Sequence, residues 1–243
     1  MKYKNMGPPY LFIISLCCSC LSAGGAPEAG IKAITIPSAD ITMSFVKAGI
    51  IDEVYVREGD EVTESQMLIR QDTEAAEASL AQKKIDLKRL MWAAERGSAT
   101  ELEVEHARLD VRMLEIMVAD MTLNSPIAGI VDVVGYEVGE AINGLEGIIR
   151  VVKTDPLWID VPLPVEQART FEKGQSVAVT FPGEEKPSVA EIIYISTVAD
   201  AASSTLRVRV EVPNPRKRPA GEHLQVSFPV AAAPLKSIIP REG

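Results

Sequence analysis

The sequence has no cysteine after residue 20, and its three cysteines are Cys17, Cys18 and Cys20. The rest of the chain therefore has neither a disulfide framework nor a metal site built from thiolates. Aromatic residues make up only 5% of the 243 residues, too few for a surface on which nucleic-acid bases stack. The net charge of −9 at pH 7 also argues against a nucleic-acid partner, which would need a basic face.

Signatures of catalysis are absent as well. The only histidines are His106 and His223, and the sequence contains no Gly-x-Ser-x-Gly, His-Glu-x-x-His or phosphate-binding loop. Paired acids such as Glu184 and Glu185 lie in a loop rich in proline and glycine, where solvated charge is the default interpretation. The sequence therefore predicts that the protein is not an enzyme and has no catalytic residue, cofactor or metal site.

Residues 1–25 predict export. Two lysines among the first four residues precede a short apolar run at 10–16, and small residues follow it. This run is too short to span a bilayer and is typical of a secretory signal peptide. Cys20 is a candidate for lipidation because Ser19 before it is small, although Cys17 stands where a lipoprotein signal has leucine. Lipidation of Cys20 and plain cleavage both remain open, and both place the body of the protein outside the cytoplasm.

Segments with the alternating pattern of β-strands lie on both sides of a central helical region. In the first, Val54 and Val56 alternate with polar neighbours before a turn at Glu58-Gly59-Asp60. In the second, an apolar run at 127–134 precedes a turn at 135–139. The matching starting points are Ala48-Gly49-Ile50 and Ala128-Gly129-Ile130. The sequence thus predicts an internal repeat of about 30 residues whose two copies are separated by an insertion.

The insertion, residues 73–122, has a hydrophobic period of about 3.6, which predicts helices. Gly97-Ser98 interrupts the pattern, and Thr100 is a suitable N-cap for a second helix. Two helices of about 22 residues joined by a tight turn predict an antiparallel hairpin that reaches roughly 33 Å. Steps of three and four residues, as in a coiled coil, assign the contacting side chains. These are positions 76, 80, 83, 87, 90 and 94 in the first helix, and Leu102, His106, Leu109, Met113, Ile116, Asp120 and Leu123 in the second.

Two further patterns on the second helix allow alternative interpretations. Val104, Val111 and Val118 recur every seven residues, either as a second stripe that packs neighbouring hairpins into a tube or as the flank of the main seam. Three methionines, at 113, 117 and 121, recur every four residues. Filling of gaps in hairpin packing is the favoured interpretation, and a thioether site for Cu(I) or Ag(I) is the alternative.

From residue 153 to 230, short strand patterns alternate with turns rich in proline, glycine and asparagine, which predicts an antiparallel β-barrel. The last stretch, 231–243, carries a weak strand pattern. The predicted fold class is therefore mainly β with an α-helical coiled-coil hairpin inserted between two β half-repeats and an antiparallel β-barrel domain after them.

The order of these pieces resembles the periplasmic adaptor subunits, or membrane fusion proteins, of tripartite efflux systems of the resistance-nodulation-division type or related ones. The matching motifs are Val54–Val62, Ser125–Val131, Val138–Glu140, Asp155–Ile159, Lys173–Val177 and Asn214-Pro215 with Gly221. The resemblance implies a split lipoyl-like domain (barrel-sandwich hybrid) at 46–72 and 123–152, a hairpin at 73–122 and a β-barrel at 153–230. It also implies a linker or membrane-proximal remnant at 30–45 and the start of a truncated membrane-proximal domain at 231–243.

The same resemblance implies partners and a docking site. The partners are an inner-membrane transporter, an outer-membrane duct protein and further copies of the chain in a ring, in the periplasm and peripheral to the membrane. A lipid on Cys20 would anchor the base to the inner membrane. The family's hairpin tip carries arginine, then leucine four residues on, then serine seven further, which falls on Arg89, Ala93 and Thr100. Thr100 keeps the hydroxyl, whereas Ala93 lacks the leucine side chain.

Two alternatives stay open at this point. One is the adaptor of an ATP-driven exporter, which the sequence does not distinguish from the adaptor of a proton-driven pump. The other is a lipoyl-like carrier or binding module without a pump. Carriers place the modified lysine in a turn between the two half-repeats, where this chain has its hairpin, with Lys83 and Lys84 in mid-helix. The transported substrate is not named by any feature of the sequence.

Overall fold

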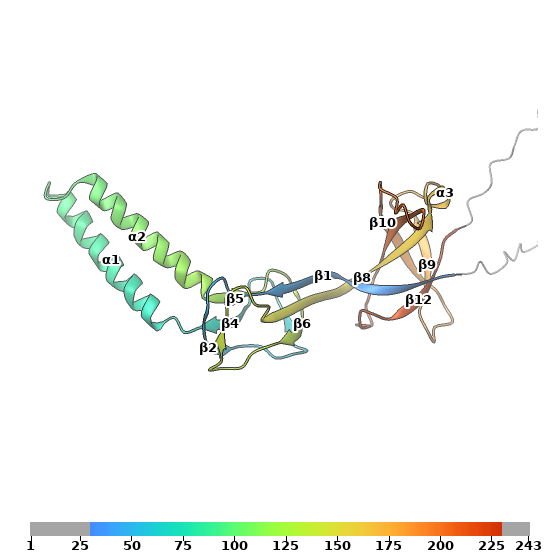
Figure 1. Ribbon diagram of the computed structural model, residues 1–243, viewed down its shortest axis with the longest axis horizontal. Coiled ribbons are helices and arrows are strands. Elements are labelled where there is room, and N and C mark those ends of the chain that lie inside the picture. The colour runs from blue at the N-terminus through green and yellow to red at the C-terminus, as the bar shows by residue number, and fades with distance from the viewer. Residues whose placement is uncertain (1–29, 230–243) are drawn as a thin grey trace, which may run out of the picture.

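The computed structural model describes residues 30–229; the predicted signal segment, with Cys20, and residues 231–243 lie outside this range. The body is elongated, with a pair of helices at one end, a β-barrel at the other and a second β unit between them (Figure 1). Its elements are β1 (Ile31–Met43), β2 (Gly49–Val54), β3 (Glu61–Val62), β4 (Met67–Gln71), α1 (Glu74–Ala94), α2 (Glu101–Asp120), β5 (Thr122–Asn124), β6 (Gly129–Val134), β7 (Ala141–Ile142), β8 (Ile149–Pro164), α3 (Val165–Ala168), β9 (Ser176–Thr180), β10 (Ser188–Ile195), β11 (Thr205–Val212) and β12 (His223–Ser227).

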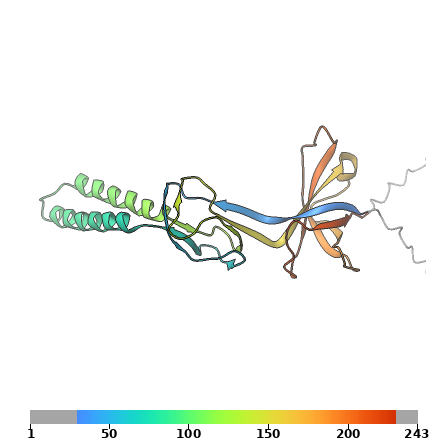
Figure 2. The same ribbon diagram turned by 60° about the horizontal axis from the view of Figure 1, so that its bottom comes forward.

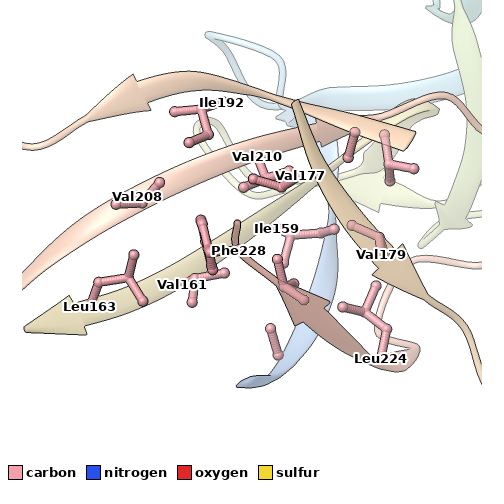
Figure 3. Close-up of a cluster of buried hydrophobic side chains, with 14 of the residues drawn as sticks. Ile159, Val161, Leu163, Val177, Val179, Ile192, Val208, Val210, Leu224 and Phe228 are labelled. Atoms are coloured by element: carbon pink, nitrogen blue, oxygen red, sulfur yellow. The ribbon is translucent and has the colours of Figure 1, made fainter. Parts of the chain in front are cut away.

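The predicted β-barrel is confirmed as a closed ring of six strands. Its order is β1-β12-β9-β10-β11-β8, and β8 pairs again with β1 to close the ring. Alternate residues of each strand point inward, so that Leu157, Ile159 and Val161 of β8 are completely buried. Figure 3 shows labelled side chains of β8, β9, β10, β11 and β12 meeting in this core, together with Phe228, which follows β12. Closure leaves no unpaired strand edge in the barrel wall.

Strand β1 corrects the expectation that residues 30–45 are a linker or a membrane-proximal remnant. It pairs with β12 and β8 in the barrel, and its second half pairs with the first half of β8 in the middle unit. The register shifts between Pro37 and Ala39. A proline breaks the alternating pattern at this point, and it can be tolerated at a bulge because it donates no hydrogen bond. Strands β1 and β8 run side by side from the barrel into the middle unit (Figure 2).

The middle unit, which we call the half-barrel, is built from the two predicted half-repeats. Each half-repeat is hydrogen-bonded to the turn of the other one. The Ile51 amide donates to the Glu140 carbonyl (2.9 Å), and the Ile51 carbonyl accepts from the Gly139 amide (2.8 Å). Val131, 80 residues later (131 − 51), makes the equivalent bonds to Asp60 (2.9 Å) and Gly59 (2.8 Å). Both glycines have φ +90°, a conformation that disfavours side chains. A separate core fills the unit, including Phe45, Leu68, Ile69, Val131, Ile149 and Val151.

Helices α1 and α2 lie side by side in both views (Figures 1 and 2). Two ion pairs join them: the Lys83 ammonium is 2.8 Å from the Asp110 carboxylate, and the Lys84 ammonium is 2.9 Å from that of Glu115. Residues of α1 therefore contact residues of α2 at a similar distance from the connecting turn, as in an antiparallel pair of helices. In α1, six positions were predicted to contact α2. The five apolar side chains at these positions are half-buried, and the sixth, Lys83, is exposed.

The predicted contact face of α2 is wrong. Leu102, Leu109 and Met113 are 65%, 54% and 69% exposed, whereas Val104 and Val111 are each only 7% exposed. The valine stripe therefore faces α1, and the leucine and methionine stripe faces away from it. Both stripes are apolar, so hydrophobicity alone did not rank them. The cross-helix ion pairs decide the matter, because Asp110 and Glu115 flank the valine stripe.

The methionines on α2 follow the same correction. Met113 and Met117 are 69% and 37% exposed, so their side chains do not fill the interior of the hairpin. Met121, at the end of the helix, is half-buried. The packing interpretation therefore holds at the base of the hairpin only.

The valine face gives a testable difference between neighbouring positions on α2. Val111→Ala removes two buried methyl groups and leaves a small cavity, and should lower the free energy of unfolding of the hairpin by roughly 2 kcal/mol. Leu109→Ala, at an exposed position, should change it by less than about 0.5 kcal/mol. Urea unfolding followed by helical circular dichroism, at concentrations where the chain is monomeric, measures both. A larger loss for Leu109→Ala would reverse the assignment of the two faces.

Candidate functional site at the hairpin tip

The tip of the hairpin is a tight turn built on the last residues of α1. The Ala93 carbonyl accepts hydrogen bonds from the Arg96 amide (3.1 Å) and the Ser98 amide (2.9 Å). Gly97 has φ +71°, which reverses the chain direction without the strain that a side chain would introduce. Ala93 therefore closes the turn through its backbone, a role that does not depend on its side chain.

Helix α2 begins at Thr100, the N-cap that the sequence predicted, and Thr100 forms a capping box with Glu103. The Thr100 hydroxyl accepts from the Glu103 amide (3.3 Å), and the Glu103 carboxylate accepts from the Thr100 amide (2.7 Å) and hydroxyl (2.8 Å). The backbone hydrogen bond from Thr100, followed by the one from its hydroxyl, lowers the pKa of Glu103. The Thr100 hydroxyl is thus already engaged within its own helix.

The three predicted tip residues do not form one cluster. The Arg89 side chain is 75% exposed and pairs with Asp86 (3.1 Å), one turn nearer the base of α1. Ala93 is half-buried four residues later, on the same side of the helix as Arg89. Thr100 lies beyond the turn at the start of α2. No hydrogen bond or ion pair in residues 30–229 joins the three, so their common role in docking stays a prediction.

The sequence analysis missed the most prominent side chains at the tip, Trp92 and Arg96. Trp92 is 59% exposed, and the Arg96 guanidinium carbon lies 3.6 Å from the centre of its ring. Arg96 also donates to the Trp92 carbonyl (3.2 Å). This is a cation–π contact on an exposed surface, and tryptophan and arginine are enriched at the energetic centres of protein interfaces. One of only two tryptophans, placed just before Gly97-Ser98, was the available signal.

Lys83 and Lys84, the mid-helix lysines considered under the carrier alternative, are both engaged in ion pairs with α2. Within residues 30–229, no three histidine, cysteine, aspartate or glutamate side chains are grouped as metal ligands would be. No helix in this range has the length and apolar character needed to cross a membrane.

Comparison with family models gives a match over most of the barrel, without β1. Residues 156–229 match the family model described as the CusB-like β-barrel domain. This range begins in β8 and ends just after β12. A comparison with curated protein sequences gave no match.

Solved structures with the same fold cover more of the chain. A MacA–MexA chimera containing the Pseudomonas aeruginosa MexA α-hairpin domain is 17% identical, with a TM-score of 0.70 over 82% of this chain and 80% of that one. ZneB from Cupriavidus metallidurans is 19% identical, with a TM-score of 0.55 over 82% and 69%. The membrane fusion protein Spr0693 from Streptococcus pneumoniae R6 is 17% identical, with a TM-score of 0.58 over 82% and 100%.

These findings confirm the resemblance stated from the sequence. The chain has the fold of the membrane fusion proteins, or periplasmic adaptors, and its barrel matches that of the CusB-like proteins. At these identities the solved structures establish the architecture alone.

The capping box predicts how the tip responds to substitution. Thr100→Ala removes the side-chain cap and should destabilise the hairpin by about 1 kcal/mol, whereas Thr100→Ser keeps the hydroxyl and should restore most of the loss. Thermal unfolding followed by helical circular dichroism compares the two variants. Equal stability of Thr100→Ala and the unsubstituted chain would show that the cap contributes nothing.

The same cap has a predicted pH dependence. Because the folded-state pKa of Glu103 lies below its ordinary value of 4.5, its contribution is present above that value and is lost as the pH falls through the lower, folded-state pKa. The difference in stability between the unsubstituted chain and Glu103→Gln should therefore shrink on acidification. A difference that grows below pH 4 would contradict this assignment.

Proposed function

We propose that the protein is a non-enzymatic periplasmic adaptor that links an inner-membrane efflux transporter to an outer-membrane duct. The observation that carries the proposal is the linear order of three units: a closed barrel, a half-barrel and an exposed helical hairpin in one elongated body (Figure 1). The hairpin and the barrel lie at opposite ends of the body and present different surfaces (Figure 1). A protein that links partners in two membranes needs two such separate binding surfaces. The adaptor fold of the solved structures supports the same function.

In this proposal the hairpin tip meets the duct. At 1.5 Å per residue, α1 extends roughly 30 Å beyond the half-barrel. The tip presents Trp92, Arg96 and Ser98 as exposed side chains. Arg89, Ala93 and Thr100 contribute as the resemblance implies, Arg89 through its exposed guanidinium and the other two by fixing the shape of the turn.

The barrel is assigned to the transporter end. The signal segment implies export to the periplasm, and a lipid on Cys20 would hold the chain at the inner membrane. Copies of the chain assemble into a ring, so that transport depends on assembly and not on a catalysed reaction. An ATP-driven exporter in place of a proton-driven pump is the alternative partner, and both would use the same adaptor surfaces.

Reversing the charge of Arg89 tests the tip. Arg89→Glu should abolish the resistance or export that depends on this chain, with secretion and helical content unchanged, because an arginine contact at an interface is replaced by repulsion. Arg112→Glu is the matched control: Arg112 is 72% exposed, is also paired with an acid three residues away, and lies nearer the base. Equal loss in the two variants would contradict a specific role for Arg89.

Photochemical cross-linking in cells identifies the partner. A photoreactive residue at Ser98, in the turn, should give adducts with an outer-membrane duct protein. The same residue at Ala119, exposed near the base of α2, should not. Duct adducts from position 119 and none from position 98, in a correctly exported protein, would refute the proposed orientation.

A further inference from the structure

The barrel and the half-barrel do not share a hydrophobic core. The buried apolar residues among 30–229 form one cluster in the barrel and a separate one in the half-barrel. Between the two units lies an open groove of about 580 Å³, lined in part by Val62 and Ile130 of the half-barrel and Pro215 of the barrel. Side-chain packing therefore does not fix the angle between the units, which depends on backbone and polar contacts.

The ribbon of β1 and β8 that connects the units is irregular where it passes this groove. Pro37 pairs with Leu157, and the next pair along the ribbon is Ala39 with Lys153. One residue of β1 therefore faces three residues of β8, 154–156, which bulge out of the ladder. A two-stranded ribbon is only marginally stable by itself, and a bulge bends it locally. The ribbon alone is thus a weak constraint on the angle between the units.

The loop between β11 and β12, residues 213–222, is anchored to both strands of the ribbon. At its start, Asn214 is buried, and its side-chain amide donates to the carbonyl of Thr154 in the β8 bulge (2.9 Å). At its end, the Gly221 amide donates to the Thr35 carbonyl of β1 (2.8 Å). The loop therefore spans the ribbon at the point where the barrel ends.

The middle of the same loop reaches the half-barrel. The Lys217 ammonium pairs with the Glu61 carboxylate, and this is the only ion pair among residues 30–229 that joins the two β units. Lys217 has φ +50°, and its amide donates to the Asn214 carbonyl (3.1 Å). A residue with a side chain is uncommon in this left-handed conformation, and strain of this kind is concentrated at functional positions. The turn anchored by Asn214 thus carries the lysine that bridges the groove.

We propose that the β11–β12 loop is a brace that fixes the angle between the barrel and the half-barrel. Asn214 holds its base on β8, and the ion pair of Lys217 with Glu61 is its releasable end. These two side chains are 71% and 66% exposed, so water and salt screen their attraction and the pair opens at a small cost. The inference deepens the proposed function and rests on it for its biological role, which is to aim the hairpin while the barrel is held at the transporter.

Double electron–electron resonance spectroscopy measures the relative placement of the two units as a distance. Spin labels replace Val138 of the half-barrel and Val189 of the barrel, which are 62% and 71% exposed, in the full chain with its three native cysteines changed to serine. Lys217→Gly removes the ammonium and keeps the turn, because glycine adopts a positive φ without strain. This variant should broaden the distance distribution about twofold, since the bulged ribbon alone then connects the units.

Exchanging the two charges separates the ion pair from the folding of the loop. Lys217→Glu and Glu61→Lys should each broaden the distribution, and the chain that carries both should return to the width of the unsubstituted chain. Salt at about 1 M should broaden the distribution of the unsubstituted chain, whose ion pair it screens, and leave that of Lys217→Gly unchanged. Lys186→Glu is the matched control, because Lys186 is also an exposed lysine in a barrel loop, and it should have no effect.

A distribution that stays narrow in the single variants, a double variant that fails to restore the width, or equal broadening by Lys186→Glu would overturn the proposal. The measurement uses the purified chain and needs no partner. A narrow distribution in Lys217→Gly, with duct adducts from Ser98 retained in cells, would refute the brace alone. The expected widths in a chain that gives no duct adducts from Ser98 would refute the adaptor function and leave the brace standing.

Discussion

The backbone pairing of β1 with β8 is the interaction on which the rest of the structure depends. Residues Thr35–Pro37 of β1 pair with β8 in the barrel, and Ala39–Met43 pair with it in the half-barrel. The two β units are therefore joined by continuous hydrogen-bonded strands and not by a loop, and a link of this kind resists bending more than a single chain does. An ion pair between Lys217 of the barrel and Glu61 of the half-barrel lies beside this link.

The half-barrel transmits this constraint to the hairpin. Strand β4 leads into α1, and β5 receives the chain from α2; these strands pair with each other, for example Ile69 with Leu123. The Gln71 backbone amide also donates to the Met121 carbonyl (2.9 Å) at the base of the helices. The helices thus leave and re-enter the β structure at neighbouring points, so the exchanged half-repeats determine where the tip projects. A tip aimed by paired strands is suited to meet a partner in a fixed orientation.

The sequence predicted the order of the pieces well because each piece has its own period and its own turn residues. The barrel strands alternate clearly, and the repeated glycines at 59 and 139 mark equivalent turns. Strand β1 was missed because Pro37 interrupts its alternation, and its partner β8 lies more than a hundred residues away. At the tip, the family resemblance implied Arg89, Ala93 and Thr100, but the exposure of Trp92 and its contact with Arg96 depend on the path of the turn. The exposure of a side chain such as Trp92 depends on the tertiary structure and is not encoded in the local residue pattern.

The wrong contact face predicted for α2 has a physical cause. A helix that packs on one partner needs one apolar face, whereas α2 has two, with valines facing α1 and larger residues facing solvent. Leaving Leu102, Leu109 and Ile116 exposed would be unfavourable for a chain that acted alone, because contiguous apolar surface promotes association. Hydrophobicity alone therefore predicted an apolar contact face for α2 without choosing between the two stripes, and the choice depends on which residues the cross-helix ion pairs of Lys83 and Lys84 bring against α1.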